Sequence, residues 1–362
     1  MELNLEKVNT GRQLEFDIAK VLAIFFMVII HVADNMSTVT NDTTIFSVFL
    51  DFLGGPLAAP VFMFAMGVGI VYSRHHSAKD SAKRGLSLLL MGYVLNFFRE
   101  TILLLIAHAN SISTTYDKSI IDTIGTVDIL QFAGMSFLLI ALFRKLRIKP
   151  VYIFLIALVM QGVGSLLIGQ FDAFQKALQY ILGLCFFTNQ YISFPLFQWF
   201  VYPAAGMLFA TILQCISDKD KFYKKVTIFS GVILLATSIC SYISGLNILN
   251  YFTGTTYYAQ NFFSFMWVLP ISLIFISFCY VLSKHLSEVV MNWFKKTAAQ
   301  VNTIYIIQWL VITYLIAFKE LAGIGYASGA LVIPLGIVIA IISIILSGLY
   351  QKIKKKVGKQ HD

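Results

Sequence analysis

The chain has 362 residues, of which 58% are hydrophobic and 12% are charged, and this composition excludes a water-soluble globular domain. The formal net charge of +9 comes from basic residues that never gather on one polar module, which argues against a nucleic-acid-binding protein. We therefore expect a protein that lies in the membrane and contacts lipid over much of its surface.

Ten apolar segments are long enough, or nearly long enough, to cross a bilayer as helices. The segment at 57–73 is short and follows Gly54-Gly55-Pro56, so we expect its outer end to be irregular. The mixed stretch 170–195 predicts an interfacial or re-entrant helix rather than another span. The predicted fold is an all-α, polytopic membrane helical bundle, and its ten spans cover residues 17–33, 57–73, 85–108, 126–143, 150–169, 196–215, 226–244, 262–282, 301–318 and 330–350.

Basic residues alternate between the loops in a way that predicts orientation. Of the 27 Lys and Arg residues, 23 fall in the N-terminal segment, in every second loop and in the C-terminal tail. Because cytoplasmic loops carry the excess of basic residues, both termini are predicted to be cytoplasmic, with 1–16 as the N-terminus and 351–362 as a basic tail. With no internal repeat or polar module evident, residues 1–362 are predicted to form a single integral membrane domain in the cell membrane. The other four basic residues are Arg99, Lys118, Lys176 and Lys319.

The first span carries two groups that hydrocarbon does not tolerate, Lys20 and His31. Eleven residues separate them, so on a helix both project from one face, about 16 Å apart along the axis. Such groups normally face a protein interior or a wet cavity. An imidazole deep in a span, in line with a cation nearer the cytoplasmic end, predicts a functional site.

Other charged groups lie at a similar depth toward the outer side. Span 3 meets Arg99 and Glu100 after about 20 Å of helix, and span 4 opens from outside with Asp128. Spans 1, 3 and 4 can therefore gather these three groups with His31. Further polar candidates on the outer side are Asp34, Asn35, Gln131, Gln198 and Trp199.

Each candidate also has a structural interpretation. Arg99 and Glu100 can form an ion pair that fixes helix packing, and Asp128 can cap the start of its helix. Asn302, Tyr305 and Gln308 are expected in the cytoplasmic half of span 9, where amide side chains often join helices by hydrogen bonds. The four cysteines show no paired spacing, and no metal site is predicted.

Several segments resemble the transmembrane acyltransferase superfamily, which includes the acyltransferase-3 and heparan-α-glucosaminide N-acetyltransferase-like proteins. The first is EFDIAK at 15–20 with an apolar run ending in His31, where the family usually has arginine at the position of Lys20. The second is PVFMFAMG at 60–67, followed by a basic turn ending in Lys83 and Arg84. The other similar stretches are ILQ at 129–131, FPLFQW at 194–199 with Gly206 further on, and YIIQW at 305–309.

The resemblance implies a cytoplasmic acyl-CoA donor, usually acetyl-CoA, and an essential histidine at His31. A positioned imidazole can take the proton of a sugar hydroxyl or amine during attack on a thioester. Asp34, Glu100 or Asp128 can orient that imidazole, and Arg99 can hold an anionic substrate or stabilise an oxyanion. The sites expected for the donor phosphates are Lys20, Lys83 and Arg84.

The sequence therefore predicts an integral membrane acyltransferase that moves an acetyl group to a hydroxyl or amine of an extracytoplasmic cell-envelope glycan or lipid-linked sugar. A homodimer is one option for its assembly. The alternative is a proton-coupled transporter or exporter in which His31, Arg99, Glu100 and Asp128 form a relay. Binding of acetyl-CoA favours the first function, whereas flux driven by a proton gradient without release of CoA favours the second.

Overall fold

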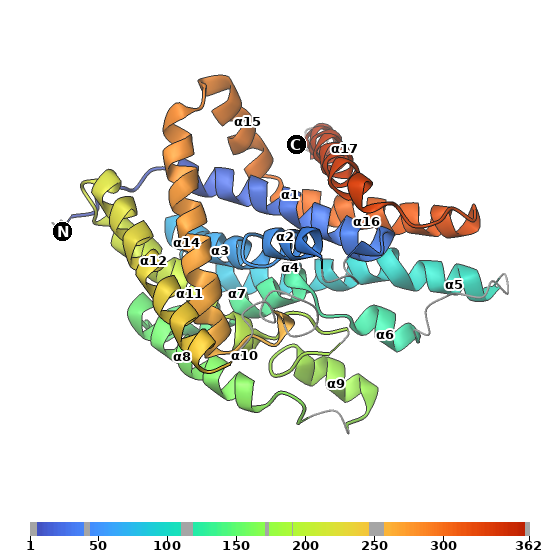
Figure 1. The fold of residues 1–362 in the computed structure, drawn as a ribbon, viewed down its shortest axis with the longest axis horizontal. Coiled ribbons are helices and arrows are strands. Elements are labelled where there is room, and N and C mark those ends of the chain that lie inside the picture. Colours follow the sequence, from blue (N-terminus) through green and yellow to red (C-terminus); the bar gives the residue numbers. More distant parts are fainter. Residues whose placement is uncertain are drawn as a thin grey trace.

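The computed structural model describes residues 6–39, 44–109, 119–170, 174–189, 191–245 and 257–358, which fold into helices joined by short connections (Figure 1). Within these ranges, pairing of extended backbone is limited to isolated bridges such as Val127 with Ile192. The all-α bundle expected from the sequence is confirmed. Residues 1–5 and 359–362 of the predicted cytoplasmic ends lie outside the described residues.

The first half of the bundle contains long helices interrupted by a π-helical turn and short connecting helices. Many begin at a side chain that accepts a hydrogen bond from a free backbone amide, as Ser77 does for α4. The elements are α1 (Leu14–Met36), α2 (Ile45–Gly54), α3 (Ala59–Tyr72), α4 (Ala78–Asn96), η2 (Phe97–Thr101), α5 (Ile102–Ala109), α6 (Ile120–Gly125), α7 (Ile129–Lys145) and α8 (Pro150–Leu166).

The second half continues with two short helices and then five long ones and an amphipathic connector. Asn261 caps α14 and Ser287 caps the connector α15 in the same way. The elements are α9 (Lys176–Gly183), α10 (Leu196–Trp199), α11 (Val201–Gln214), α12 (Lys219–Ile243), α14 (Phe262–His285), α15 (Glu288–Ala298), α16 (Val301–Leu321) and α17 (Gly329–Gly358).

Among the described residues, 8 helical stretches are long and apolar enough to cross a membrane, so the chain is an integral multi-pass membrane protein. The two remaining predicted spans, 126–143 and 150–169, correspond to α7 and α8, each of 17 residues. At 1.5 Å per residue, 17 residues cover only about 25 Å of a hydrocarbon core of about 30 Å. The count of ten spans and the cytoplasmic placement of both termini stay predictions.

The second span is longer than the sequence predicts. It was expected at 57–73, but the helical stretch begins with α2 at Ile45 and continues through a break into α3. The amide of Gly55 donates to the carbonyl of Asp51 at 2.7 Å, which closes α2 before Pro56. The half-buried Asp51 and this break divide the apolar run, so a search for uninterrupted apolar residues misses the first half of the span.

Helix α1 is the central element of the bundle. It contacts α2, α3, α14, α15, α16 and α17, and its inward residues from Ile18 to Val32 are almost entirely buried. Its first turn is fixed by Glu15, whose Oε1 accepts hydrogen bonds from Lys219 and Tyr223 at 2.7 Å each. A functional group on the inner face of α1 is therefore held rigidly inside the protein.

Helices α3 and α11 approach each other closely at two glycines. A Cβ added at Gly67 would lie 2.0 Å from the carbonyl oxygen of Pro203, and one at Gly206 would lie 2.1 Å from that of Phe64. Small residues that let backbones approach are typical of helix interfaces in membranes. The close contact with α11 fixes the position of α3 in the bundle.

Gly206→Ala should destabilise the protein by about 1–3 kcal/mol, because the new methyl group collides with backbone atoms that cannot turn aside. The measurement is the thermal unfolding midpoint of the purified protein in detergent. The matched control is Gly231→Ala on α12, where a new Cβ meets nothing within 4 Å. Equal midpoints for the two variants would show that α3 and α11 separate without cost.

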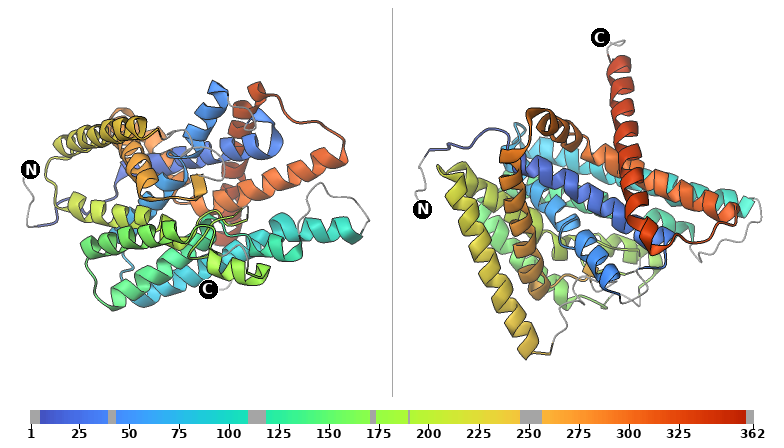
Figure 2. Two further views of the ribbon diagram at one scale, coloured as in Figure 1. Left: turned by 60° about the horizontal axis from the view of Figure 1, so that its bottom comes forward. Right: turned by 45° about the horizontal axis from the view of Figure 1, so that its top comes forward.

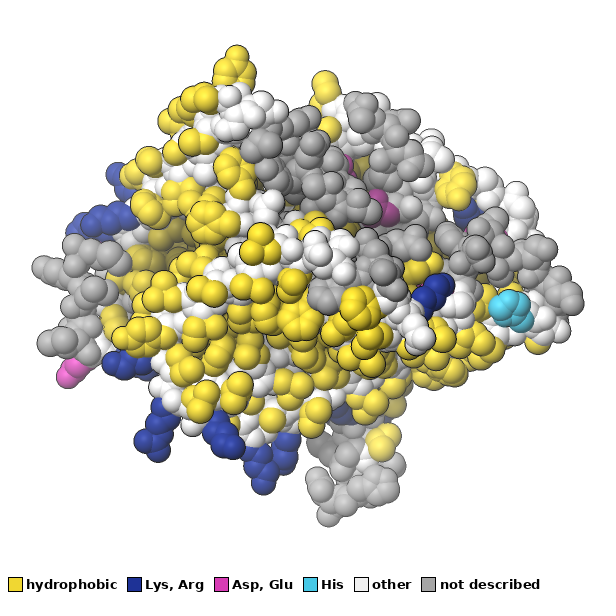
Figure 3. All heavy atoms as spheres, turned by 90° about the horizontal axis from the view of Figure 1, so that it is seen from below, with side chains coloured by type: hydrophobic (Ala, Val, Ile, Leu, Met, Phe, Trp, Pro, Cys, Tyr) yellow, Lys and Arg dark blue, Asp and Glu magenta, His cyan; other side chains and the backbone are white. Residues whose placement is uncertain are grey.

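Apolar side chains dominate the outer surface, as a membrane protein requires. They form a broad band across one face, and most of the Lys and Arg residues visible there gather at one edge of it (Figure 3). The second half of α17 stands away from the other helices (Figure 2). Its side chains Ile345, Leu349 and Ile353 are 57%, 49% and 61% exposed and suit contact with lipid.

Candidate active site

His31 lies on α1 and faces α16. Its Nδ1 lies 3.2 Å from Oε1 of Gln308. Because an amide oxygen accepts and cannot donate, this contact places the proton on Nδ1 and leaves Nε2 with a free lone pair. The side chain of Asn35 donates to the backbone carbonyl of His31 at 2.8 Å and supports the same turn. An imidazole held in this form can accept a proton at Nε2.

The indole of Trp309 connects His31 to Arg99. The ring centroids of His31 and Trp309 lie 4.0 Å apart with the planes at 30°, and the guanidinium carbon of Arg99 lies 4.4 Å from the indole centroid. A desolvated guanidinium over an indole face is stabilised by about 2 kcal/mol. His31, Trp309 and Arg99 therefore form one column across α1, α16 and η2.

Arg99 is 4% exposed and holds two carboxylates. Its Nη2 lies 3.1 Å from Oε1 of Glu100, and its Nη1 lies 3.1 Å from Oδ2 of Asp128. Arg99 belongs to the π-helical turn η2, a distortion that is often found at functional sites. The turn is fixed by Asn96, whose side chain donates to the carbonyls of Ile124 and Thr126 at 2.9 and 2.7 Å.

Asp128 both caps α7 and pairs with Arg99. Its Oδ1 accepts from the amide of Ile129 at 2.7 Å, while its other oxygen faces Arg99. Gln131 completes the cap, since its Oε1 accepts from the Asp128 amide at 3.2 Å and its Nε2 donates to the carbonyl of Thr126. The sequence offered two interpretations of Asp128, a helix cap and a member of a charged cluster, and the side chain has both roles.

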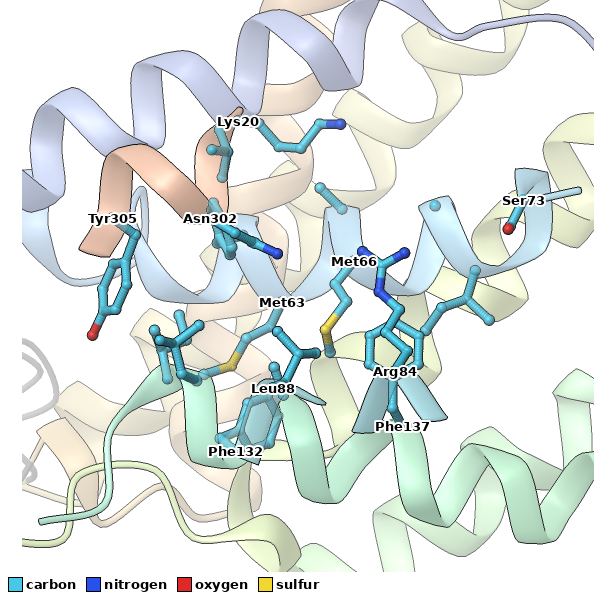
Figure 4. Close-up of a pocket in the computed structure, with 18 of the residues that line it drawn as sticks. Lys20, Met63, Met66, Ser73, Arg84, Leu88, Phe132, Phe137, Asn302 and Tyr305 are labelled. Atoms are coloured by element: carbon cyan, nitrogen blue, oxygen red, sulfur yellow. The ribbon is translucent and has the colours of Figure 1, made fainter. Parts of the chain in front are cut away.

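A cavity of about 380 Å³ runs along the inner faces of α3, α4, α7 and α16. Tyr305 stands at one end, and Met63, Met66 and Phe132 line the middle, while Arg84 and Ser73 lie toward the other end (Figure 4). Lys20 and Asn302 project from α1 and α16 over the same space. The cavity thus runs from a basic end of the bundle to Tyr305, one helical turn before Gln308; His31 itself does not line it.

Basic side chains gather at that second end. Lys20 lies 3.4 Å from Asp17, and the Arg84 guanidinium lies 4.8 Å from the centroid of the Phe137 ring. Arg144, which the sequence did not single out, also lines the cavity and donates to Ser81 Oγ at 2.6 Å. Lys83 is exposed and is not among the residues that line the cavity.

The predicted substrate residues divide into two groups. Asp34 is exposed beyond the end of the His31 turn. Burial, and then the charges of Asp34 and Asp128, raise the pKa of the Tyr258 phenol, which places Tyr258 near both carboxylates. Trp199 donates from Nε1 to the carbonyl of Tyr258 at 3.0 Å, so it supports that residue. Gln198 is fully buried and donates to the carbonyl of Gly164, away from His31.

The sequence missed the part of the site that α16 supplies. Tyr305, Gln308 and Trp309 recur at positions i, i+3 and i+4, so they share one face of the helix. Asn302, Tyr305 and Gln308 were expected at another depth than His31, but Gln308 contacts His31 directly, so these two residues lie at one level of the bundle.

Four polar atoms around His31 have no hydrogen-bond partner among the described residues. Burying such atoms without partners is costly, so they mark a place where substrate or water completes the structure. Within the same described part of the chain, no group of three His, Cys, Asp or Glu residues could hold a metal ion. The four atoms are Arg99 Nε, Tyr305 Oη, Gln308 Nε2 and Trp309 Nε1.

The fold and this site define a polytopic membrane protein with a buried arginine, joined to two half-buried carboxylates and, through Trp309, to a half-buried histidine. The family described as heparan-alpha-glucosaminide N-acetyltransferase, catalytic, matches residues 12–244, and the chain belongs to this family of membrane acetyltransferases. No curated protein and no solved structure matches the chain. The matched region contains His31, Arg99 and Asp128, whereas α16 with Gln308 and Trp309 follows it.

Proposed function

We propose that the protein transfers an acetyl group from cytoplasmic acetyl-CoA to a hydroxyl or amine of an extracytoplasmic cell-envelope saccharide, acting as a single domain in the cell membrane. The observation that carries the proposal is the cavity that leads from Lys20, Arg84 and Arg144 to Tyr305, one helical turn before the Gln308 that contacts His31. Phosphate groups of CoA suit the basic end, because Arg and Lys form strong charge-assisted bonds with phosphate. The narrow apolar middle suits the pantetheine arm.

In this proposal the thioester lies at the Tyr305 end, and the acceptor enters from the side of Asp34 and Tyr258. His31 acts as general base through Nε2, since Nδ1 is engaged by Gln308. Gln308 is therefore the residue that orients the imidazole, in place of the carboxylates considered from the sequence. Arg99 and its two carboxylates hold Trp309 against the imidazole ring.

Lys20→Met should weaken acetyl-CoA binding about tenfold, because one charge-assisted contact contributes about 1.5 kcal/mol. Calorimetric titration of the purified protein with acetyl-CoA measures the effect. The matched control is Lys225→Met, which removes an exposed lysine from α12. Unchanged affinity for Lys20→Met would remove Lys20 from the donor site and leave it as a boundary lysine that extends toward water.

A further inference from the structure

Tyr305 lines the cavity at the end opposite Arg84 and Ser73 (Figure 4). It lies one turn before Gln308 and Trp309 on the same face of α16, so the residue that borders the cavity is continuous with those that contact His31. The other residues at this end include Ile129, Leu130 and Met63, whose side chains are apolar. Tyr305 lies at this end of the cavity with Asn302 one turn before it on α16 (Figure 4).

The hydroxyl of Tyr305 is buried but unpartnered. The residue is 2% exposed, and its Oη makes no hydrogen bond to the described residues. Asp128 and Trp309 both approach the phenol. No hydrogen bond of good geometry forms, however, and the Asp128 oxygens already receive the amide of Ile129 and the guanidinium of Arg99. A buried donor in this state calls for an acceptor that arrives with a ligand.

We propose that the Tyr305 hydroxyl donates a hydrogen bond to the carbonyl oxygen of the acetyl thioester and stabilises the oxyanion that forms there, an inference that rests on the proposed function. Arg99, the sequence-based candidate for this role, has both terminal nitrogens engaged by Glu100 and Asp128. Tyr305 lines the cavity, and its hydroxyl makes no hydrogen bond of good geometry to the described residues.

The acceptor oxygen or nitrogen forms a bond to the carbonyl carbon, its proton passes to Nε2 of His31, and the carbonyl π electrons move to the oxygen held by Tyr305. When the carbonyl re-forms, the carbon–sulfur bond breaks. The thiolate of CoA then takes the proton from His31, so the products are the acetylated acceptor and CoA.

The kinetic test is Tyr305→Phe, which removes the hydroxyl and keeps the ring. The kcat for acetyl transfer from acetyl-CoA to an alkyl α-glucosaminide should fall by about 10²–10³, as for loss of one oxyanion donor, with little change in acetyl-CoA Kd. The control is Tyr242→Phe, an 88% exposed residue on α12, which should keep the wild-type kcat. A Tyr305→Phe protein with wild-type kcat overturns the inference and leaves the proposed function standing. A wild-type protein without acetyl-CoA-dependent transfer removes both.

A spectroscopic measurement covers the case in which Tyr305→Phe does not fold. Acetyl-CoA labelled with ¹³C at the carbonyl is bound to His31→Ala protein, which cannot turn it over, and the infrared carbonyl band is recorded. A hydrogen bond from Tyr305 lowers the stretching frequency, so the bound band should lie below that of free acetyl-CoA. A bound band at the free frequency with Tyr305 intact contradicts the inference.

Discussion

Replacing His31 with alanine should abolish acetyl transfer while leaving expression and acetyl-CoA binding nearly intact. The imidazole is held by Gln308 at 3.2 Å with Nε2 free, so its removal takes away the group that accepts the acceptor's proton. Loss of a general base costs about 10²–10⁴ in rate. Steady-state release of CoA with an alkyl α-glucosaminide as acceptor measures the loss, and calorimetry with acetyl-CoA shows whether the fold survives.

His31→Gln is the informative companion variant. A glutamine amide can replace the hydrogen bonds of the ring but cannot take up a proton. The variant should therefore be as inactive as His31→Ala. If it turned over at a near-normal rate, His31 would be a hydrogen-bonding residue only, and Glu100 and Asp128 would be the next candidates for the base.

Arg99→Met should unfold the protein at a much lower temperature than the wild type. The guanidinium is 4% exposed and lies between Glu100 and Asp128, so its removal leaves two carboxylates close together without a cation. Breaking a buried ion pair from one side costs about 3–5 kcal/mol. Loss of the contact with the Trp309 ring adds to this cost. Differential scanning fluorimetry in detergent measures the midpoint.

The double variant Arg99→Met with Asp128→Asn separates charge from packing. Neutralising one carboxylate should restore part of the lost stability, because the remaining repulsion is removed while the cap at α7 is kept by the asparagine. A single variant Arg99→Met with the wild-type midpoint would mean that water reaches both carboxylates and that the centre is not buried.

Apolar segment length predicted most of the fold. The segments near 17–33, 262–282 and 301–318 correspond to α1, α14 and α16 because uninterrupted apolar residues of that length form spanning helices. Apolar segment length did not predict α2, because a polar Asp51 and the glycine break before Pro56 divide one long stretch into two parts. Sequence hydropathy does not report how such a broken helix packs.

The part of the candidate site that depends only on position along a membrane span was predictable from the sequence. Counting residues along spans 1, 3 and 4 brought His31, Arg99 and Asp128 to one level, and the structure joins them through Trp309 and direct ion pairs. The partner of the imidazole was not predictable in this way. Gln308 reaches His31 because α16 packs against α1, and Arg144 reaches the cavity because α7 packs against α4. These are tertiary contacts that no spacing encodes.

Acetyl transfer across the membrane is tested most directly by finding on which side of a vesicle each product appears. The protein is reconstituted in vesicles that enclose an alkyl α-glucosaminide, and radiolabelled acetyl-CoA is added outside to molecules whose basic loops face outward. The account predicts label on the enclosed saccharide with an equal amount of free CoA outside, independent of any proton gradient. Movement of the saccharide driven by a proton gradient, with no release of CoA, would contradict the account and identify a transporter.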